Sequence, residues 1–219
     1  ELKRKGNVVI VCGRNAEKIN EMRKQGFEAY QCDLTHGSDI ENLAMEMEQR
    51  FPDLNVLVNN AGVQYNYQIT DTIMPLGIIG DELRINITGQ IVLTHLLLPL
   101  LSRQEGACII NTGSALGLSS KKDALVYAAS KAAMHNFTKG LRYALKDVGI
   151  DVVEFIPPLT ESGMTEGREG KKMPAGSLVG QIIPQIEKGR KLVTTGNIRF
   201  FLFLAHYFPA FAYRLISKS

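Results

Sequence analysis

The sequence predicts an α/β fold in which a doubly wound parallel sheet lies between two layers of helices. Short β-branched and apolar runs alternate along the chain with longer helical segments, and this alternation is typical of parallel sheets. Polar turns directly follow some of these runs, as expected where the carboxyl ends of parallel strands form a ligand-binding edge. The chain has 219 residues, 45% hydrophobic and 21% charged, which is enough for one domain with a substantial core.

The first half of the chain is expected to contain three strands, each followed by a helix. The run Asn7-Val8-Val9-Ile10-Val11-Cys12 is rich in β-branched residues, and it ends in Gly13-Arg14-Asn15. The predicted strands are 7–12, 28–32 and 54–59, and the helices that follow them are 16–25, 38–50 and 80–103.

The second half continues the same alternation. It is expected to contain a strand at 107–112, a helix at 125–147 and a strand at 151–156. Gly149 stands directly after the predicted helix, where a glycine commonly ends it. We therefore expect one domain over residues 1–219, without internal repeats.

Tyr127 and Lys131 are the most informative pair of residues in the chain. They lie four residues apart in Tyr-Ala-Ala-Ser-Lys, and positions i and i+4 share one face of a helix. A positive charge near a phenol favours the phenolate and lowers its pKa, which would make Tyr127 a proton donor and acceptor near neutral pH. Ser114 lies upstream and is expected to hold the oxygen that Tyr127 protonates. The alternative is a half-buried tyrosine beside a solvated lysine.

Three further motifs accompany this pair. Val56-Leu57-Val58, read as a short buried strand, runs into Asn59-Asn60-Ala61-Gly62. Asn86 stands in Arg-Ile-Asn, and Ser114 follows the strand Ala107-Cys108-Ile109-Ile110-Asn111. With these motifs the chain resembles the short-chain dehydrogenase/reductase family over nearly its whole length. The resemblance implies a Rossmann-type, three-layer αβα fold and a hydride transfer between a nicotinamide and a carbonyl or alcohol carbon.

The resemblance also implies roles for four residues. Tyr127 would be the general acid in reduction and the base in oxidation, and Lys131 would lower its pKa and bind the nicotinamide ribose. Ser114 would position the substrate oxygen. Asn86 would hold a water that links Lys131 to solvent, and its alternative role is that of a capping or packing amide.

Several other residues are expected at the cofactor. Asn59 would brace the central strands, and Ala61 and Gly62 would let the backbone approach the cofactor. Asn60 is expected among the cofactor-binding residues. Arg14 follows a strand that should end at the adenosine ribose, where an arginine suits a 2′-phosphate and an acidic residue suits NAD. We therefore expect NADP(H) rather than NAD(H), with a solvated loop arginine as the alternative.

By the same resemblance, two further segments are expected to contact the cofactor or the substrate. Asp33 resembles the adenine-contacting aspartate, with Leu34 beside it. Pro157, Thr160 and Ser162 belong to the segment that binds the nicotinamide carboxamide. Pro158 replaces the glycine that is usual in the family, and it restricts the backbone there. Residues 159–180 are rich in Gly, Ser, Lys and Glu, and we expect them to form a substrate lid.

One feature of the family is missing from the sequence. The glycine-rich turn between the first strand and the first helix is not present, and the chain opens at what resembles the end of that helix. We expect the chain to be an N-terminally truncated form, about 25 residues short by the usual size of a βα unit, without the first central strand. Loss of that strand would leave two unpaired edges facing each other. Because the glycine-rich turn is missing, an alternative function stays open, that of a non-catalytic binding or regulatory protein of the same fold.

Composition narrows the range of partners. The net charge is +3 with dispersed basic residues, so no nucleic-acid partner is expected. The histidines and cysteines lack ligand spacing, so no metal site is expected, and Cys12, Cys32 and Cys108 are predicted to be core residues in a reducing compartment. We expect a cytoplasmic homodimer or homotetramer that acts on a small carbonyl or alcohol substrate.

The hydrophobic C-terminal extension, residues 197–219, has two interpretations. Its apolar run from Phe200 to Ile216 is interrupted by His206, Pro209 and Arg214, which argues against a membrane-spanning helix. It is expected to form a helix pair over the substrate pocket or a subunit interface. The alternative is a segment that rests on a membrane as a peripheral contact, with Arg199, Arg214 and Lys218 as anchors.

Overall fold

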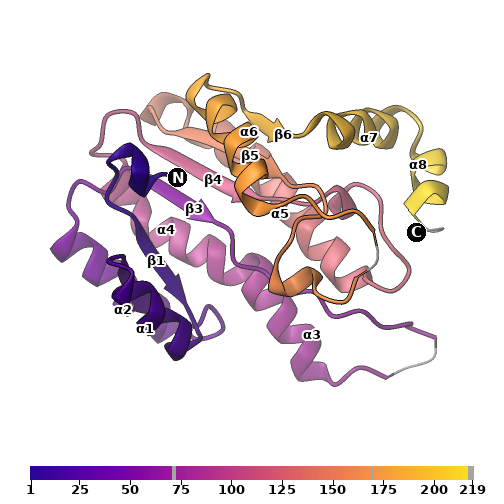
Figure 1. Ribbon diagram of the computed structural model, residues 1–219, viewed down its shortest axis with the longest axis horizontal. Helices are drawn as coiled ribbons and strands as arrows, with labels where there is room; N and C mark the ends of the chain where they lie inside the picture. The colour runs from indigo at the N-terminus through magenta and orange to yellow at the C-terminus, as the bar shows by residue number, and fades with distance from the viewer. Residues whose placement is uncertain (71–72, 169, 217–219) are drawn as a thin grey trace.

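The computed structural model describes residues 1–70, 73–168 and 170–216, and it confirms the α/β class (Figure 1). The strands pair in parallel in two sheets. The smaller sheet contains β1 (Ile10–Gly13) and β2 (Glu28–Gln31). The larger sheet has the order β3 (Val56–Asn59), β4 (Cys108–Thr112), β5 (Asp151–Ile156) and β6 (Leu192–Thr194).

Helices follow the strands in the predicted order. They are α1 (Ala16–Lys24), α2 (Gly37–Arg50), α3 (Leu76–Leu83), α4 (Gly89–Leu101), α5 (Leu125–Ala144), α6 (Ala175–Glu187), α7 (Gly196–Tyr207) and α8 (Pro209–Ile216). A π-helix, η2 (Arg84–Thr88), joins α3 to α4 without a break. Short 3₁₀ turns are η1 (Lys3–Lys5), η3 (Ala115–Gly117), η4 (Lys146–Val148) and η5 (Gly163–Thr165).

Local chemistry explains several of the helix boundaries. The side chain of Asn15 caps α1 by accepting a hydrogen bond of 2.9 Å from the Lys18 amide. Gly149 has φ of 80°, the left-handed conformation that glycine adopts easily, so the chain leaves η4 for β5 at the predicted residue. Pro209 is the first residue of α8, where its missing amide hydrogen has no cost.

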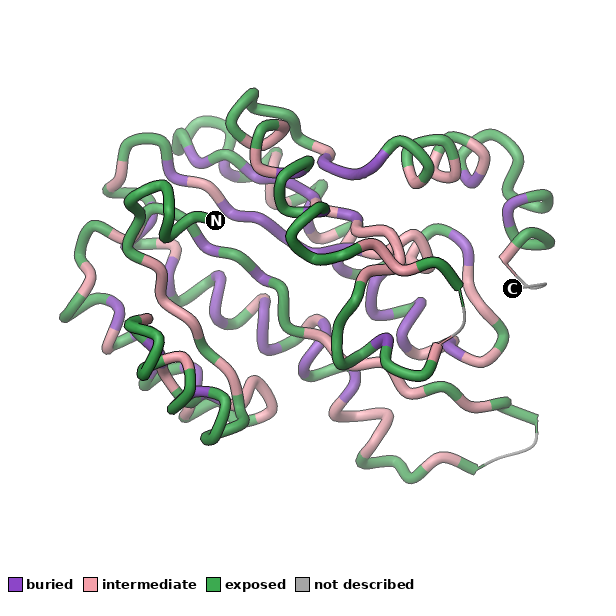
Figure 2. The backbone as a smooth tube through the Cα atoms, viewed as in Figure 1, coloured by how far each residue is buried: buried purple, intermediate pink, exposed green. Residues whose placement is uncertain are grey.

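The two sheets are separate between β1 and β3, the place where the sequence predicts a missing central strand. A single hydrophobic cluster nevertheless spans both. It combines Tyr30 and Cys32 from the smaller sheet with Leu57 and Ile109 from the larger one, and α2 and α4 pack together above them. On the opposite face, α6 covers β4 to β6 through a second cluster that includes Leu178 and Ile182. Figure 2 shows the buried residues concentrated along β4, β5 and the helices that cover them.

Some sequence-based predictions of burial and boundaries were wrong. β1 begins at Ile10, not at residue 7, and Val8 is 76% exposed. Val56 and Val58 were expected to be buried but are 39% and 46% exposed, because burial alternates along β3 and only Leu57 and Asn59 face the core. Of the three cysteines predicted to lie in the core, Cys32 is buried, Cys108 is half-buried and Cys12 is exposed, because β1 is a short strand without a buried residue. The predicted lid, 159–180, runs into α6 from Ala175 onward.

The continuous helical run Leu76–Leu101 is long and apolar enough to cross a membrane, and it alone meets that criterion among the described residues. Within this run, an 18-residue window has a mean hydropathy of 1.2, and 44% of that window is buried. A core helix of a soluble protein meets the same criterion. This run packs on α2 and α5.

Candidate active site

Ser114, Tyr127 and Lys131 come together at the carboxyl end of β4. Ser114 follows β4 after Gly113 and caps η3, where its Oγ accepts a hydrogen bond of 3.2 Å from the Leu116 amide. Tyr127 and Lys131 lie one turn apart on α5, and both are buried, with 8% and 3% of the residue exposed. Lys131 Nζ is 5.8 Å from the centre of the Tyr127 ring, and the Ser114 hydroxyl hydrogen-bonds the phenol.

The pKa of Tyr127 is raised, not lowered as the sequence analysis predicts. Burial of the phenol is the largest cause, since it disfavours the phenolate. The hydrogen bond with Ser114 and the charge of Arg168 act in the opposite direction, and the carboxyl of Glu82 adds to the increase. Tyr127 is therefore a protonated phenol near neutral pH, as a proton donor must be.

Lys131 is held by the backbone of β4. Its Nζ donates a hydrogen bond of 2.8 Å to the carbonyl oxygen of Thr112. Burial lowers the pKa of Lys131 from 10.5 to about 8, because the ammonium has lost most of its water. The side chain therefore points from α5 to the end of the strand that carries Ser114.

Gly117 allows the Ser114 turn to lie directly on α5. A β-carbon at this position would come within 2.8 Å of the Lys131 carbonyl carbon and 2.9 Å of the Ala132 amide nitrogen. Those atoms belong to the helix backbone and cannot move aside. Only glycine fits at this contact between η3 and α5, which fixes Ser114 relative to Lys131.

Asn86 lies in the π-helix η2 and is fully buried. Its Oδ1 accepts a hydrogen bond from the Val63 amide, and its Nδ2 donates to the Val63 carbonyl, each at 2.8 Å. Nδ2 also donates to Ser130 Oγ at 3.1 Å, and Ser130 in turn donates to the Tyr127 carbonyl at 2.7 Å. The side chain therefore ties the loop after β3 to α5, the packing role that was left as the alternative. π-helical turns are frequent at functional sites.

Asn59 braces the central strands as predicted. Its Nδ2 donates to Asn111 Oδ1 on β4 at 2.8 Å and to Thr94 Oγ1 on α4 at 2.9 Å. Asn111 extends the network to α5 by donating to Thr138 Oγ1 at 3.0 Å. These buried amides connect β3, β4, α4 and α5 below the site.

Gly62 leaves space in front of Lys131. A β-carbon at Gly62 would lie 3.8 Å from Lys131 Nζ, 3.5 Å from Asn86 Oδ1 and 3.5 Å from Met164 Cε. The neighbouring Ala61 is held in place through its carbonyl, which accepts a hydrogen bond of 2.8 Å from Gln90. At Gly62 the loop after β3 thus presents backbone rather than a side chain to Lys131.

Asn60, also in this loop, contacts the end of β4. Its Oδ1 accepts a hydrogen bond of 3.1 Å from the Thr112 hydroxyl. Asn60 is exposed. It therefore lies at the ligand-binding edge of the larger sheet, beside the strand that leads to Ser114.

Arg14 and Asp33 lie at the ends of the neighbouring strands β1 and β2. Burial alone would raise the pKa of Asp33, but hydrogen bonds from Thr35 and the charges of His36 and Arg14 outweigh it and leave the pKa lowered. Arg14 is exposed, and Leu34 is half-buried with its carbonyl against α4 at Gly89. These residues follow strands of the smaller sheet, whereas Ser114 follows β4 of the larger sheet.

The segment after β5 forms a turn beside the site. The Thr160 hydroxyl donates to the Pro158 carbonyl at 2.8 Å, and Thr160 bridges to Met173 in parallel. Ser162 begins η5, where its hydroxyl lies 3.2 Å from the Thr165 hydroxyl. Pro157 is half-buried at the end of β5.

Sequence reasoning missed Arg168, Glu82, Ser130 and Gly117. Arg168 Nη1 donates to Gln64 Oε1 at 2.8 Å, which links the predicted lid to the loop after β3, and its charge reaches Tyr127. Glu82 is 1% exposed, accepts a hydrogen bond of 3.2 Å from the Tyr65 amide and has a pKa raised by burial. The sequence offered one signal for Glu82, a charged residue within an apolar stretch. For Ser130 the signal was its position inside the Tyr-x-x-x-Lys motif.

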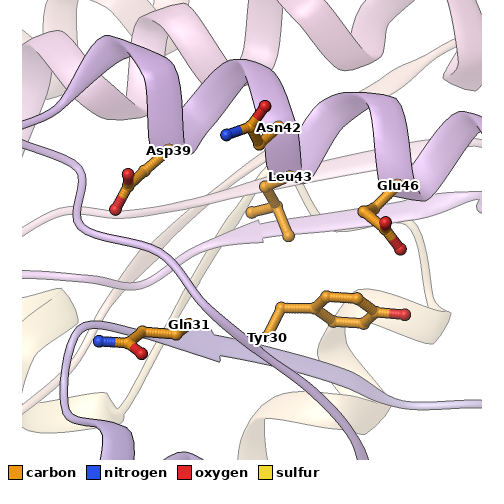
Figure 3. Close-up of a pocket in the computed structure, with 6 residues that line it drawn as sticks. All are labelled: Tyr30, Gln31, Asp39, Asn42, Leu43 and Glu46. Carbon is orange, nitrogen blue, oxygen red and sulfur yellow. The ribbon is translucent and has the colours of Figure 1, made fainter.

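Two cavities among the described residues lie away from this site. One, of about 390 Å³, is lined by residues of β2 and α2 that include Tyr30, Asp39 and Glu46 (Figure 3). The other, of about 370 Å³, is a groove between α2 and α4. In the described part of the chain, no group of three or more His, Cys, Asp or Glu side chains is arranged to hold a metal ion.

The parallel α/β fold with a buried Ser-Tyr-Lys arrangement has counterparts among known proteins. A family model described as short chain dehydrogenase matches residues 1–172. The chain is 34% identical to the uncharacterized oxidoreductase DltE of Bacillus subtilis, over 76% of this chain and 67% of that protein. It is 29% identical to an uncharacterized oxidoreductase of Staphylococcus epidermidis, over 84% of this chain and 81% of the relative.

Solved structures show the same fold. A short-chain dehydrogenase from Sphingobium yanoikuyae in complex with NADPH superposes with a TM-score of 0.80 at 20% identity, covering 88% of this chain and 79% of that one. The Pseudomonas aeruginosa RhlG/NADP active-site complex is 29% identical with a TM-score of 0.65, covering 72% and 65%. The chain therefore belongs to the short chain dehydrogenase family and is an oxidoreductase.

Proposed function

We propose that this protein transfers a hydride between NADP(H) and the carbon of a small carbonyl or alcohol substrate. The observation that carries the proposal is the buried arrangement of Ser114, Tyr127 and Lys131. A hydroxyl and a phenol hydrogen-bond each other at the end of β4, and an amine lies one helical turn from the phenol.

These residues can deliver a proton to a substrate oxygen. Ser114 would donate a hydrogen bond to the carbonyl oxygen and hold it against the phenol. Tyr127 is protonated because burial raises its pKa, and it would give its proton to the oxygen as negative charge develops there. The nicotinamide, when bound, supplies the hydride to the carbon. In the oxidation direction Tyr127 would accept the alcohol proton as phenolate.

Lys131 supports the exchange of that proton. Its ammonium lies near the phenol and has a pKa of about 8, so it can both stabilise a phenolate and pass on a proton near neutral pH. Asn86 Oδ1 also borders the space in front of Gly62, 3.5 Å from where a β-carbon of that residue would lie. We assign Asn86 to the positioning of this region and to a proton path from Lys131 to solvent.

The site fits a nicotinamide cofactor at several points. The space in front of Gly62, which a β-carbon would occupy, lies beside Lys131, where the ribose would bind. Pro157, Thr160 and Ser162 would hold the carboxamide, and Asn60, Ala61 and Leu34 would line the cofactor. Arg14, exposed at the end of β1, supports NADP(H) over NAD(H), because a guanidinium matches a 2′-phosphate. The NADP-bound RhlG at 29% identity adds to this support.

We also infer that the protein forms a homo-oligomer through the long helices. Val92 and Leu96 on α4 are 36% and 37% exposed, and the apolar groove between α2 and α4 lies beside them. The molar mass in solution, measured by light scattering, tests this inference.

The decisive experiment compares wild type with Tyr127→Phe in NADPH titrations and in carbonyl-reduction assays. Removal of the phenol hydroxyl should lower kcat by about 10²-fold or more and leave the affinity for NADPH within about twofold, because the ring stays and only the proton donor is lost. Tyr143→Phe, on the exposed end of the same helix, is the matched control and should behave as wild type.

Three outcomes separate the alternatives. Turnover by wild type that Tyr127→Phe retains would contradict the assigned proton donor. Binding of NADH with higher affinity than NADPH would contradict the cofactor preference. If wild type neither alters the fluorescence of NADPH nor reduces any carbonyl substrate, the enzyme proposal is wrong. The protein is then the non-catalytic binding or regulatory protein of the same fold.

A further inference from the structure

The helices α7 and α8 carry an exposed aromatic surface that the proposed reaction does not use. We call it the aromatic patch, and its members, each between 43% and 64% exposed, are Phe200, Phe203, Tyr207, Phe208, Phe211 and Tyr213. Elsewhere in the part of the chain that the structure describes, only Tyr143 is an aromatic residue of comparable exposure. The concentration of exposed rings in one short segment marks an interaction surface.

The sequence spacing places these rings on the outer side of the helices. In α7, Phe200, Phe203 and Tyr207 follow the spacing i, i+3, i+7 of one helical face, and the rings of Phe203 and Tyr207 lie 4.8 Å apart. Ala205 in α7 and Ala212 in α8 are buried, and Phe201, Leu202 and Leu204 are half-buried, so both helices bury one side against the protein. The rings of the aromatic patch lie on the other side, where they are exposed.

The segment that carries the aromatic patch contains basic residues but no acidic ones. No aspartate or glutamate occurs after Glu187, whereas Arg199 and Arg214 lie within α7 and α8. Arg199 is exposed next to Phe200. Aromatic and apolar side chains with basic residues, and without acidic ones, are typical of helices that lie in the interface of an anionic membrane.

The position of the helix pair suits contact with a flat surface. Figure 1 shows α7 continuing outward from the end of β6 and α8 turning at the edge of the molecule, beside the rest of the fold rather than within it. Figure 2 shows mostly exposed residues along both helices. α7 also packs on η3, the turn that follows Ser114, so a surface bound to α7 lies near the active site.

We propose that the aromatic patch docks the protein on an anionic lipid bilayer. The rings would enter the boundary between head groups and acyl chains, and Arg199 would lie at the level of the phosphates. A second copy of the chain fits less well. A twofold interface brings the same patch of each subunit together, and the segment has no carboxylate to pair with its arginines. A bilayer that contains phosphatidylglycerol supplies the negative charge that the patch lacks.

Vesicle co-sedimentation of the full chain tests the proposal. Wild type should sediment with vesicles of phosphatidylcholine mixed with phosphatidylglycerol, and weakly with phosphatidylcholine alone, and added salt should weaken the binding. The double variant Phe200→Ser with Phe203→Ser should reduce binding to the anionic vesicles about tenfold or more, because both rings are removed from the lipid. Leu76→Ser with Tyr143→Ser is the matched control, since both side chains are highly exposed but lie outside the patch.

A charge reversal tests the electrostatic part. Arg199→Glu should weaken binding to the anionic vesicles about fivefold or more, in line with the interaction of one basic residue with an anionic surface. Lys139→Glu makes the same change at an exposed position of α5 and should leave binding as in wild type.

Three results would contradict the docking proposal. Wild type that stays in the supernatant with anionic vesicles would overturn it, as would a loss of binding in the control double variant equal to that in the patch variant. If the patch variant binds vesicles as wild type but has a smaller molar mass by light scattering, the patch is an interface between copies of the chain. Carbonyl reduction is measured separately in solution, so failure of docking is distinguishable from failure of the proposed chemistry.

Discussion

Lys131 is needed for the proposed reaction, but the burial of its charge lowers the stability of the folded protein. The residue is 3% exposed, and its ammonium donates to the carbonyl oxygen of Thr112. An isolated ammonium is costly to bury, and the lowered pKa of about 8 reports that cost. A site that needs a charged amine next to a phenol therefore lowers the stability of the fold that carries it.

We expect Lys131→Met to be more stable than wild type near neutral pH. The folded-state pKa of about 8 lies below the unfolded value of 10.5. Below about pH 8 the ammonium is charged in both states, and its burial destabilises the folded protein by up to about 3 kcal/mol. Between about pH 8 and 10.5 the unfolded chain binds more protons, so wild-type stability rises with pH relative to the variant.

Urea unfolding at about pH 7 and about pH 10 checks this prediction. The stability advantage of Lys131→Met should be largest at the lower pH and shrink at the higher one. Lys139→Met, at an exposed position of the same helix, should show no such trend. An advantage that grows with pH would show that the amine is not buried as the structure has it.

At the scale of elements, the contact between η3 and α5 determines where Ser114 lies. We expect Gly117→Ala to destabilise the fold by about 1–3 kcal/mol, because its β-carbon would press on the backbone of Lys131 and Ala132. Turnover should fall further than stability explains, since Ser114 would move relative to Tyr127. Thermal unfolding and kcat measured on the same preparation check both effects.

Gly140→Ala is the matched control for that prediction. Gly140 lies within α5 and has no heavy atom within 4 Å of an added β-carbon. Alanine there should stabilise the helix by about 0.5–1 kcal/mol and leave kcat unchanged. Equal losses in both variants would show that Gly117 is not a special contact.

The segment that carries Arg168 is the second element that acts on the site. Arg168 lowers the pKa of Tyr127 against the effect of burial and hydrogen-bonds Gln64 across the site. We expect Arg168→Gln to raise the pKa of Tyr127 further. Alcohol oxidation, which needs phenolate, should then require a higher pH than in wild type.

The pH profile of kcat/KM in the oxidation direction measures this change. The alkaline rise should move to higher pH in Arg168→Gln, whereas Lys171→Gln, an exposed charge of the same segment, should keep the wild-type profile. If the pH profile of Arg168→Gln is the same as that of wild type, the guanidinium does not lie close enough to the phenol to change its pKa.

The sequence predicts the elements of this site better than their environments. Tyr127, Lys131 and Ser114 could be found because helical spacing and chain order are local properties, and the structure brings all three together. The pKa of Tyr127 could not, because its burial depends on packing between distant elements. Gly117 is one glycine among 20, and only the tertiary contact with α5 distinguishes it.

At the scale of the whole molecule, the two sheets are joined by helices rather than by strand pairing. β1 and β3 lie in different sheets, and α2 packs on α4 over a common hydrophobic cluster. The sequence predicted the break, since its position follows from the strand order of the family. It did not predict that one hydrophobic cluster would still span the break, because that depends on how α2 meets α4.

This arrangement predicts unequal local stability. β4 is paired on both sides and its residues are mostly buried, whereas the smaller sheet is a single pair of short strands. Amides of β1 and β2 should therefore exchange with solvent deuterium faster than those of β4. Hydrogen exchange followed by mass spectrometry measures both regions in one experiment.

Two core substitutions show whether the helices provide the link. Leu97 on α4 is 3% exposed and lines the groove with α2, and Ile182 on α6 is 5% exposed and packs on the larger sheet. Leu97→Ala should accelerate exchange in β1 and β2 more than in β5, because the lost packing, about 2–5 kcal/mol, lies between α2 and α4. Ile182→Ala should do the reverse. Equal acceleration of every strand by both variants would mean that the two sheets unfold together, and that the pairing break between β1 and β3 does not divide the molecule energetically.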